Sequence, residues 1–329
     1  MSDVFTVVGA GAWGRALTSV LLRNGEKVCL WDKFFARNLP DKSILNDANL
    51  TTQELENLVI TEDLEFATQS CSSIVIVIPS SAFPDFIPQL KSFVLPRHNI
   101  VVASKGFIPN TQDLLLTYVK QELGSTRDIA VLSGPSFAKE VMEQKATCVM
   151  LASENKQFAN LMQSKFSNES FSLYATDDVV GVQIGGACKN VIAILVGILD
   201  GMKYGANSKA AIINFGLQEI VSLAKLFGAT DPKAIYGLAG IGDLLLTCND
   251  NLSRNRRFGM FVGEGMSCED ASNKVQQTIE GLDTVKSMHD LVKKFNLQLP
   301  ITEAVYDIIY NQQSCHDAVP RLFTSLKTW

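Results

Sequence analysis

The stretch VFTVVGAGAWG, residues 4–14, decides the fold, because it joins an apolar run to a glycine-rich turn near the start of the chain. The turn has the pattern G-x-G-x-x-G between a predicted strand and a predicted helix. In that context Gly9 allows the tight turn, Gly11 lets a pyrophosphate approach the backbone, and Gly14 lets the helix pack close to the strand. The pyrophosphate lies on unpaired N–H groups at the positive end of the helix. The stretch predicts a dinucleotide site; the alternative is a glycine-rich turn without a ligand.

Strand-like and helical segments alternate through the first half of the chain. Ile74–Ile78 is a run of five β-branched residues, which is typical of a strand covered on both faces. Similar runs occur at Lys27–Trp31, Ile100–Ala103, Ile129–Leu132 and Thr147–Ala152. This alternation predicts an α/β fold with a doubly wound parallel, Rossmann-like sheet, which binds ligands beyond the carboxyl ends of its strands.

Three polar segments follow such strands, and we expect them to lie along one crevice: residues 79–81 (PSS), 104–106 (SKG) and 133–137 (SGPSF).

The pattern changes after about residue 176. Asp177 or Asp178 can cap a long apolar helix that runs to about Gly201. Further helical patterns cover approximately 208–228, 231–240, 254–265, 268–277, 281–295 and 301–312. At 329 residues, two domains are the natural expectation. We therefore predict a dinucleotide-binding domain over residues 1–176 and an all-helical substrate and catalytic domain over residues 177–329.

Composition excludes several classes of function. The net charge of −5 argues against a nucleic-acid partner. Seven scattered cysteines without a C-x-x-C pair favour reduced thiols in the cytoplasm. The three histidines lack metal-ligand spacing, so no metal is expected. The N-terminal run is too short for a signal peptide. Val191–Leu199, the longest apolar run, is about half a membrane span, so we expect no integral membrane segment.

Lys189 is the first candidate for chemistry. It follows GGAC at residues 185–188, and small residues one helical turn earlier would let another element come close. An apolar setting disfavours the ammonium and lowers its pKa, which suits proton exchange near neutral pH. The alternative is a lysine that extends to solvent.

Two further segments contribute polar groups. Lys105 follows a predicted strand and would project an ammonium into the crevice; otherwise it is a surface turn lysine. Asp243 stands at a predicted helix start, either as a cap or as an acid that orients a substrate hydroxyl or the lysine. Thr247, four residues on, shares that helix face.

The run SRNRR at residues 253–257 combines three arginines with a serine that can cap the helix that follows. Cationic forks at a helix N-terminus suit a phosphate, although a solvated basic helix face gives the same pattern. A nicotinamide cofactor carries its own redox chemistry, and the protein must add orientation and a proton donor. Together these features indicate a reductase of a small phosphorylated ketone.

The chain resembles the bacterial NAD(P)-dependent glycerol-3-phosphate dehydrogenase family from Gly9 to about Leu326. Four motifs carry the resemblance in the family's order: GPSFAKE (134–140), GACKNVIAI (186–194), GLAGIGDLLLTC (237–248) and SRNRRFG (253–259). The resemblance implies reversible reduction of dihydroxyacetone phosphate to sn-glycerol 3-phosphate for phospholipid synthesis, and a homodimer.

The resemblance also implies roles for individual residues. Lys189 matches the proton donor or acceptor, and Lys105 a lysine that reaches both cofactor and substrate. Asp243 and Thr247 match a polar pair beside the reacting carbon. The substrate-contacting positions also include Gly134, Ser136, Ser253, Arg254 and Asn255. The cofactor-contacting positions are Gly9, Gly11, Ala12, Trp13, Gly14, Lys33, Lys105, Ala138, Arg254, Thr278 and Glu280.

Three positions depart from the family pattern. Ala12 replaces a usual serine, which removes one cofactor hydrogen bond. Lys209 replaces an arginine, and a lysine cannot reproduce an arginine fork. Asn214 and Phe215 replace a typical Thr-Arg, which removes a charge.

Cofactor choice is mixed in the sequence. Asp32 ends the second predicted strand and would accept from a ribose 2′-hydroxyl, which favours NAD. Lys33 and Arg37 follow and would hold a 2′-phosphate. We expect NADP or NAD, with dual use and a slight preference for NADP.

Two alternatives to this function remain open at this stage. A ketopantoate or β-hydroxyacid reductase keeps the fold and changes the substrate. A non-catalytic nucleotide sensor keeps only cofactor binding.

Overall fold

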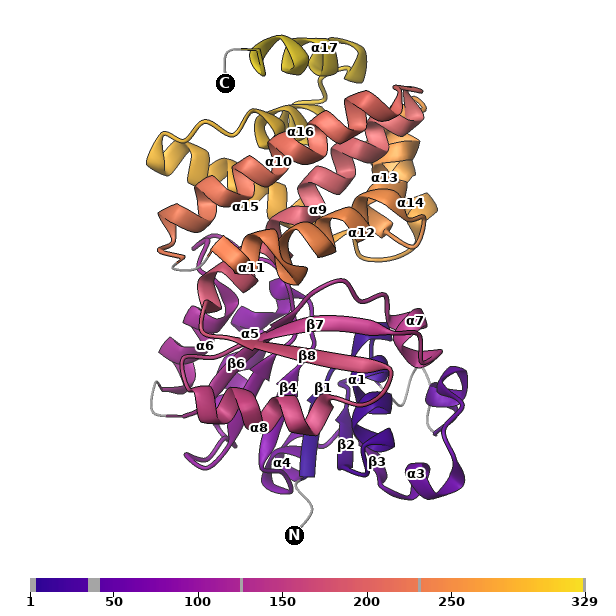
Figure 1. Cartoon of the computed structure of the whole chain (residues 1–329), viewed down its shortest axis with the longest axis vertical. Coiled ribbons are helices and arrows are strands. Elements are labelled where there is room, and N and C mark those ends of the chain that lie inside the picture. The colour runs from indigo at the N-terminus through magenta and orange to yellow at the C-terminus, as the bar shows by residue number, and fades with distance from the viewer. Residues whose placement is uncertain (1–3, 35–41, 125–126, 230–231, 328–329) are drawn as a thin grey trace. The chain divides into compact units, whose positions relative to one another are not determined.

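The computed structural model describes residues 4–34, 42–124, 127–229 and 232–327. The chain divides into two compact units. The first unit comprises Met1–Lys105 and Leu114–Val182, and the second comprises Gly106–Asp113 and Gln183–Trp329. Figure 1 shows strands in the first part of the chain and helices alone in the last. The predicted class, a Rossmann-like sheet followed by a helical region, is confirmed.

The first unit contains one eight-stranded sheet in the order β3-β2-β1-β4-β5-β6-β7-β8. Its strands are β1 (Val4–Val8), β2 (Lys27–Trp31), β3 (Leu58–Thr61), β4 (Ser73–Ile76), β5 (Asn99–Val102), β6 (Ile129–Ser133), β7 (Thr147–Ala152) and β8 (Phe171–Thr176).

Every neighbouring pair is parallel except β6 and β7. The antiparallel pair of β6 and β7 is thus the one departure from the parallel sheet that we predicted. The helix between these strands, α7 (Ala138–Met142), has five residues and is about 7 Å long. It is too short to return the chain along a six-residue strand of about 20 Å.

Helices cover both faces of the sheet. In β1, Val7 and Val8 point to opposite faces, and both are fully buried. On one face α1 packs against α7 and α8, and elsewhere in the unit α5 packs against α6. The helical elements of this unit besides α7 are α1 (Ala12–Arg23), η1 (Lys42–Ala48), α3 (Thr52–Glu56), α4 (Leu64–Gln69), η2 (Ser80–Ala82), α5 (Phe83–Lys91), α6 (Leu115–Leu123) and α8 (Lys156–Phe166).

Helices make up most of the described part of the second unit, in which Phe107 forms an isolated β-bridge. They are α9 (Val179–Gly201, which begins in the first unit), α10 (Ala206–Leu226), α11 (Pro232–Tyr236), the π-helix η3 (Leu238–Gly242), α12 (Asp243–Asn249), α13 (Arg254–Gly263), α14 (Cys268–Val275), α15 (Glu280–Phe295), α16 (Pro300–Tyr310) and α17 (Cys315–Ser325).

The apolar helix α9 is the core of this arrangement. Of the two predicted caps, Asp178 is the one whose carboxylate accepts, from the N–H of Gly181 at 2.9 Å. By length and composition α9 could cross a membrane, but 94% of its most apolar window is buried inside the structure. A helix that is apolar all round and buried by protein is typical of a globular core.

Candidate active site

The glycine-rich turn between β1 and α1 leaves room only where a ligand would need it. A Cβ on Gly14 would lie 1.9 Å from the carbonyl oxygen of Gly9, and a Cβ on Gly9 would lie 2.6 Å from that of Val77. A Cβ on Gly11 would meet nothing within 4 Å. Gly11 also caps α1 without a side-chain acceptor. The turn is therefore closed on the protein side and open at the helix N-terminus, which fits a pyrophosphate.

Side chains around this turn are held by backbone groups. Asp32, at the end of β2, accepts from the N–H of Ala10 at 2.9 Å and from that of Phe34 at 3.0 Å. Trp13 donates its indole N–H to the carbonyl of Ala103 at 3.2 Å. Ala12 and Lys33 are exposed, whereas Arg37 lies outside the described residues.

The ends of β4, β5 and β6 lie side by side, as their order in the sheet requires. Ser104 donates to the carbonyl of Ile78 at 2.6 Å. The carbonyl of Gly134 accepts from the Lys105 ammonium at 3.2 Å and from the Ser136 hydroxyl at 3.0 Å. The structure thus gathers three of the predicted substrate-contacting residues around one carbonyl. Ala138, the first residue of α7, is partly buried beyond them.

In the second unit, Lys189 on α9 meets Asp243, the first residue of α12. The ammonium donates to the carboxylate at 2.5 Å, and the two residues are 8% and 1% exposed. The opposite charges offset part of the cost of burying each one. Asp243 follows the N-cap residue Gly242 and is not the cap itself. Its carboxylate instead accepts from the Lys189 ammonium.

Glycines bring this ion pair together. A Cβ on Gly185, one turn before Lys189, would lie 2.6 Å from the carbonyl oxygen of Ala239 in η3. A Cβ on Gly240 would lie 1.9 Å from the carbonyl oxygen of Ile235, five residues earlier, so this glycine is needed for the tight local path of η3 itself. The predicted close approach of another element is therefore found. It is a π-helix, a form that is frequent at functional sites.

Thr247 is 4% exposed and uses its hydroxyl proton within its own helix. It donates to the backbone carbonyl of Asp243 at 2.6 Å. Its oxygen lone pairs remain the groups with which it could accept from a ligand.

The first turn of α13 carries the predicted phosphate cradle. Ser253 caps it by accepting from the N–H of Arg256 at 3.2 Å, as expected. The side-chain oxygen of Asn255 accepts from the N–H of Gly281 at 2.9 Å. This contact fixes the amide orientation, so its NH₂ donors point away from Gly281. Arg254 lies 4.0 Å from the Glu280 carboxylate at the start of α15.

Thr278, two residues before Glu280, is exposed.

Sequence reasoning missed how α9 and α13 are joined. Each helix carries a Gly-xxx-Gly spacing, at residues 197 and 201 and at residues 259 and 263. A Cβ on any of the four would lie 2.0–2.3 Å from a backbone oxygen of the partner helix. The helices therefore touch backbone to backbone. The repeated spacing was the signal that could have revealed this contact.

One departure from the family pattern lies in the same region. Lys209 forms an ion pair with Asp200 at 2.7 Å. Asn214 is exposed and accepts from Gln218 at 3.0 Å. Nothing in the structure explains the substitution at Phe215.

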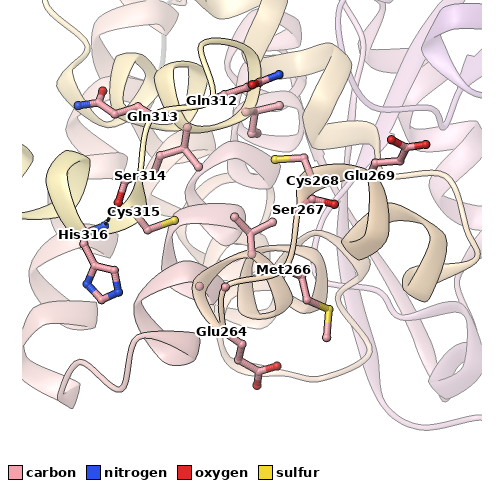
Figure 2. Close-up of a pocket in the computed structure, with 15 residues that line it drawn as sticks. Glu264, Met266, Ser267, Cys268, Glu269, Gln312, Gln313, Ser314, Cys315 and His316 are labelled. Carbon is pink, nitrogen blue, oxygen red and sulfur yellow. Dashed lines mark hydrogen bonds between the residues drawn. The ribbon is translucent and has the colours of Figure 1, made fainter.

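A separate pocket of about 650 Å³ lies in the second unit (Figure 2). Cys268 and Cys315 are among its lining residues, which include none of the predicted site residues. Burial raises the pKa of both thiols, that of Cys315 to about 11. Among the described residues, no group of three or more His, Cys, Asp or Glu side chains could hold a metal ion.

Known proteins resemble the chain along nearly its whole length. The family profile for the N-terminal part of NAD-dependent glycerol-3-phosphate dehydrogenase matches residues 4–159, and that for the C-terminal part matches residues 178–320. A glycerol-3-phosphate dehydrogenase [NAD(P)+] of Haemophilus ducreyi is 40% identical, over 96% of this chain and 95% of its own.

Solved structures agree. Glycerol-3-phosphate dehydrogenase from Coxiella burnetii has a TM-score of 0.89 and 36% identity, over 98% of this chain and 99% of its own. A 2-dehydropantoate 2-reductase from Methylococcus capsulatus has a TM-score of 0.58 and 12% identity, over 93% of this chain and 95% of its own, which shows the shared fold alone. The profile matches and the identities together place this chain in the NAD-dependent glycerol-3-phosphate dehydrogenase family.

Proposed function

We propose that this chain catalyses the reversible reduction of dihydroxyacetone phosphate to sn-glycerol 3-phosphate with NADH or NADPH. The observation that carries the proposal is the buried Lys189–Asp243 pair. Lys189 lies on α9, whose backbone touches that of α13 at Arg256. Family membership favours this substrate over ketopantoate.

The glycine-rich turn is the proposed cofactor site. Gly9 and Gly14 shape the turn, and Gly11 leaves open the space that a pyrophosphate needs. By resemblance to the family, Trp13, Lys33 and Ala138 are the further proposed cofactor contacts in the first unit, and Thr278 and Glu280 are those in the second. When bound, the nicotinamide supplies the hydride equivalent for the substrate's central carbon.

Lys189 is the proposed proton donor for the carbinol oxygen in the direction of reduction. Its ammonium is held in one position by the Asp243 carboxylate, which itself has almost no solvent contact. A fixed donor in a dry site favours proton transfer and stabilises developing negative charge. Thr247 would accept from a substrate hydroxyl, because its own proton is already donated.

The start of α13 is the proposed phosphate site. The backbone N–H groups of its first two residues, the amide NH₂ of Asn255 and the guanidinium of Arg254 are all donors. Ser253 holds the turn in shape. Lys105, with Gly134 and Ser136 beside it, would add a second ammonium for the substrate from the first unit.

The proposal keeps residues 1–176 as the dinucleotide-binding domain and residues 177–329 as the helical substrate and catalytic domain, with single contacts to each ligand from the other domain. It also includes a cytoplasmic homodimer. Seven unpaired cysteines are in keeping with a reducing compartment, and sedimentation analysis tests the dimer.

Reduced-cofactor oxidation with dihydroxyacetone phosphate, run separately with NADH and NADPH, tests the function. We expect turnover with both cofactors and a modest preference for NADPH. Ketopantoate serves as the competing substrate. Turnover of ketopantoate alone, or cofactor binding without turnover of either ketone, would contradict the proposal.

A further inference from the structure

A single carboxylate joins three helices beside the proposed phosphate site. Asp200, near the end of α9, accepts from Lys209 on α10 at 2.7 Å through one oxygen. Its other oxygen accepts from Arg256 on α13 at 2.5 Å. The side chain of Asp200 is 14% exposed, that of Lys209 is 29% exposed and that of Arg256 is 13% exposed. Because these side chains are mostly buried, dissolved salt screens the attraction between their charges less than it screens ion pairs on the surface.

Arg256 links this carboxylate to the first turn of α13. The backbone N–H of Arg256 donates to the hydroxyl oxygen of the N-cap residue Ser253. Its guanidinium also donates to Asn251, in the loop before the helix. One side chain therefore ties the loop on one side of Arg254 and Asn255 to the helix α9 on the other.

The backbone of Arg256 is held at the same place. A Cβ on Gly197 would lie 2.1 Å from the Arg256 carbonyl oxygen, so α9 and α13 are in direct contact there. The glycine contact fixes how close the helices lie, and the Asp200 contact opposes sliding or rotation of the first turn.

This network and the proposed proton donor are neighbours. The buried Cys248 thiol, whose pKa burial raises to about 12, feels the charges of Lys189, Arg256, Asp200 and Asp243.

We propose that Asp200 is a positioning residue for the phosphate end of the substrate, and that Lys209 completes its effect. This inference rests on the proposed function. Asp200 touches neither substrate nor cofactor in this account. It acts through Arg256 on the turn that carries Arg254 and Asn255.

The Asp200→Asn variant of the full chain tests the inference. It keeps the shape of the side chain and removes the charge. We expect the KM for dihydroxyacetone phosphate and the Ki of inorganic phosphate, as a competitive inhibitor, to rise together by about tenfold. The KM for NADPH and kcat should change by less than about twofold, because neither cofactor nor proton donor is displaced.

Lys209 provides a second variant if Asp200→Asn does not fold. Lys209→Met should raise both phosphate-dependent constants in the same direction, and Lys209→Arg, which keeps the cation, should lie nearer to wild type. Glu26→Gln is the matched control, since Glu26 pairs with Lys165 at 3.0 Å in the first unit with side chains only 11% and 22% exposed. It should lower stability without changing the Ki of phosphate.

The outcomes separate the two proposals. A wild-type chain that does not reduce dihydroxyacetone phosphate overturns the proposed function and this inference with it. A wild-type chain that does so, while Asp200→Asn and Lys209→Met keep the wild-type Ki of phosphate, overturns the inference alone. A fall in kcat with unchanged KM and Ki would also overturn it.

Discussion

Gly185→Ala tests whether the close approach of α9 to η3 holds the Lys189–Asp243 pair together. The added Cβ would lie 2.6 Å from the carbonyl oxygen of Ala239, and ordinary contact begins at 3.4 Å. The π-helix must therefore withdraw by about 0.8 Å. Because Asp243 follows η3 directly, the 2.5 Å contact with Lys189 would lengthen to as much as about 3.3 Å. That is beyond the range of a charge-assisted hydrogen bond.

The expected cost falls mainly on the chemical step. A misplacement of about 1 Å can lower turnover by about a hundredfold, so we expect kcat to fall by one to two orders of magnitude. Overpacking should lower the free energy of unfolding by about 1–3 kcal/mol. The higher helix propensity of alanine returns up to about 1 kcal/mol of that loss. The variant should therefore fold.

The assay is dihydroxyacetone phosphate-dependent oxidation of NADPH, with thermal unfolding measured on the same samples. Gly205→Ala is the matched control, because a Cβ there meets nothing within 4 Å and its backbone φ is −74°. It should keep the wild-type kcat. A Gly185→Ala enzyme that folds and turns over at the wild-type rate would refute the reasoning.

Three further predictions follow from the same geometry. Gly11→Ala should keep the wild-type Tm, since its Cβ meets nothing within 4 Å, but it should bind NADPH more weakly in a fluorescence titration. Gly14→Ala should not fold, because its Cβ would lie 1.9 Å from a backbone oxygen. Wild-type NADPH affinity in Gly11→Ala would contradict pyrophosphate binding at this turn. Asn255→Asp keeps an acceptor for the Gly281 N–H and turns a carboxylate toward the phosphate. It should raise the KM for dihydroxyacetone phosphate at least about tenfold, which corresponds to a loss of about 1.4 kcal/mol in binding free energy, with little change in Tm. An unchanged KM would argue against a phosphate site at the start of α13. Burial raises the pKa of Glu219 from 4.5 to about 7. Between these pH values the folded chain keeps a proton that the unfolded chain releases, so stability falls as pH rises, and Glu219→Gln should flatten the decline of Tm between pH 5 and pH 8; parallel Tm profiles would contradict this.

Local sequence rules were sufficient where one segment determines its own structure. The turn at residues 9–14 needs glycine for reasons that any strand–turn–helix junction shares, and the structure follows them. The caps at Asp178 and Ser253 are equally local. Such signals depend on nearest neighbours, which the sequence displays directly.

Contacts between distant segments were harder to predict. The small residues before Lys189 indicated that something packs there, but not that it is a π-helix or that it delivers Asp243. The Asp200 network joins residues 200, 209 and 256, and each looks like an ordinary helix-surface charge by itself. The strands β3 and β8 and the helix α17 were not predicted, because short or half-exposed segments carry weak periodicity.

The turnover of Lys189→Met tests the central claim most directly. Methionine keeps the length of the side chain and removes the proton donor. Removing the ammonium beside the buried Asp243 carboxylate should cost about 3–5 kcal/mol of stability, so folding is verified through retained NADPH binding. The account predicts that kcat falls by about three orders of magnitude or more. A folded, NADPH-binding Lys189→Met enzyme with kcat within about tenfold of wild type, a loss of only 1.4 kcal/mol, would contradict it.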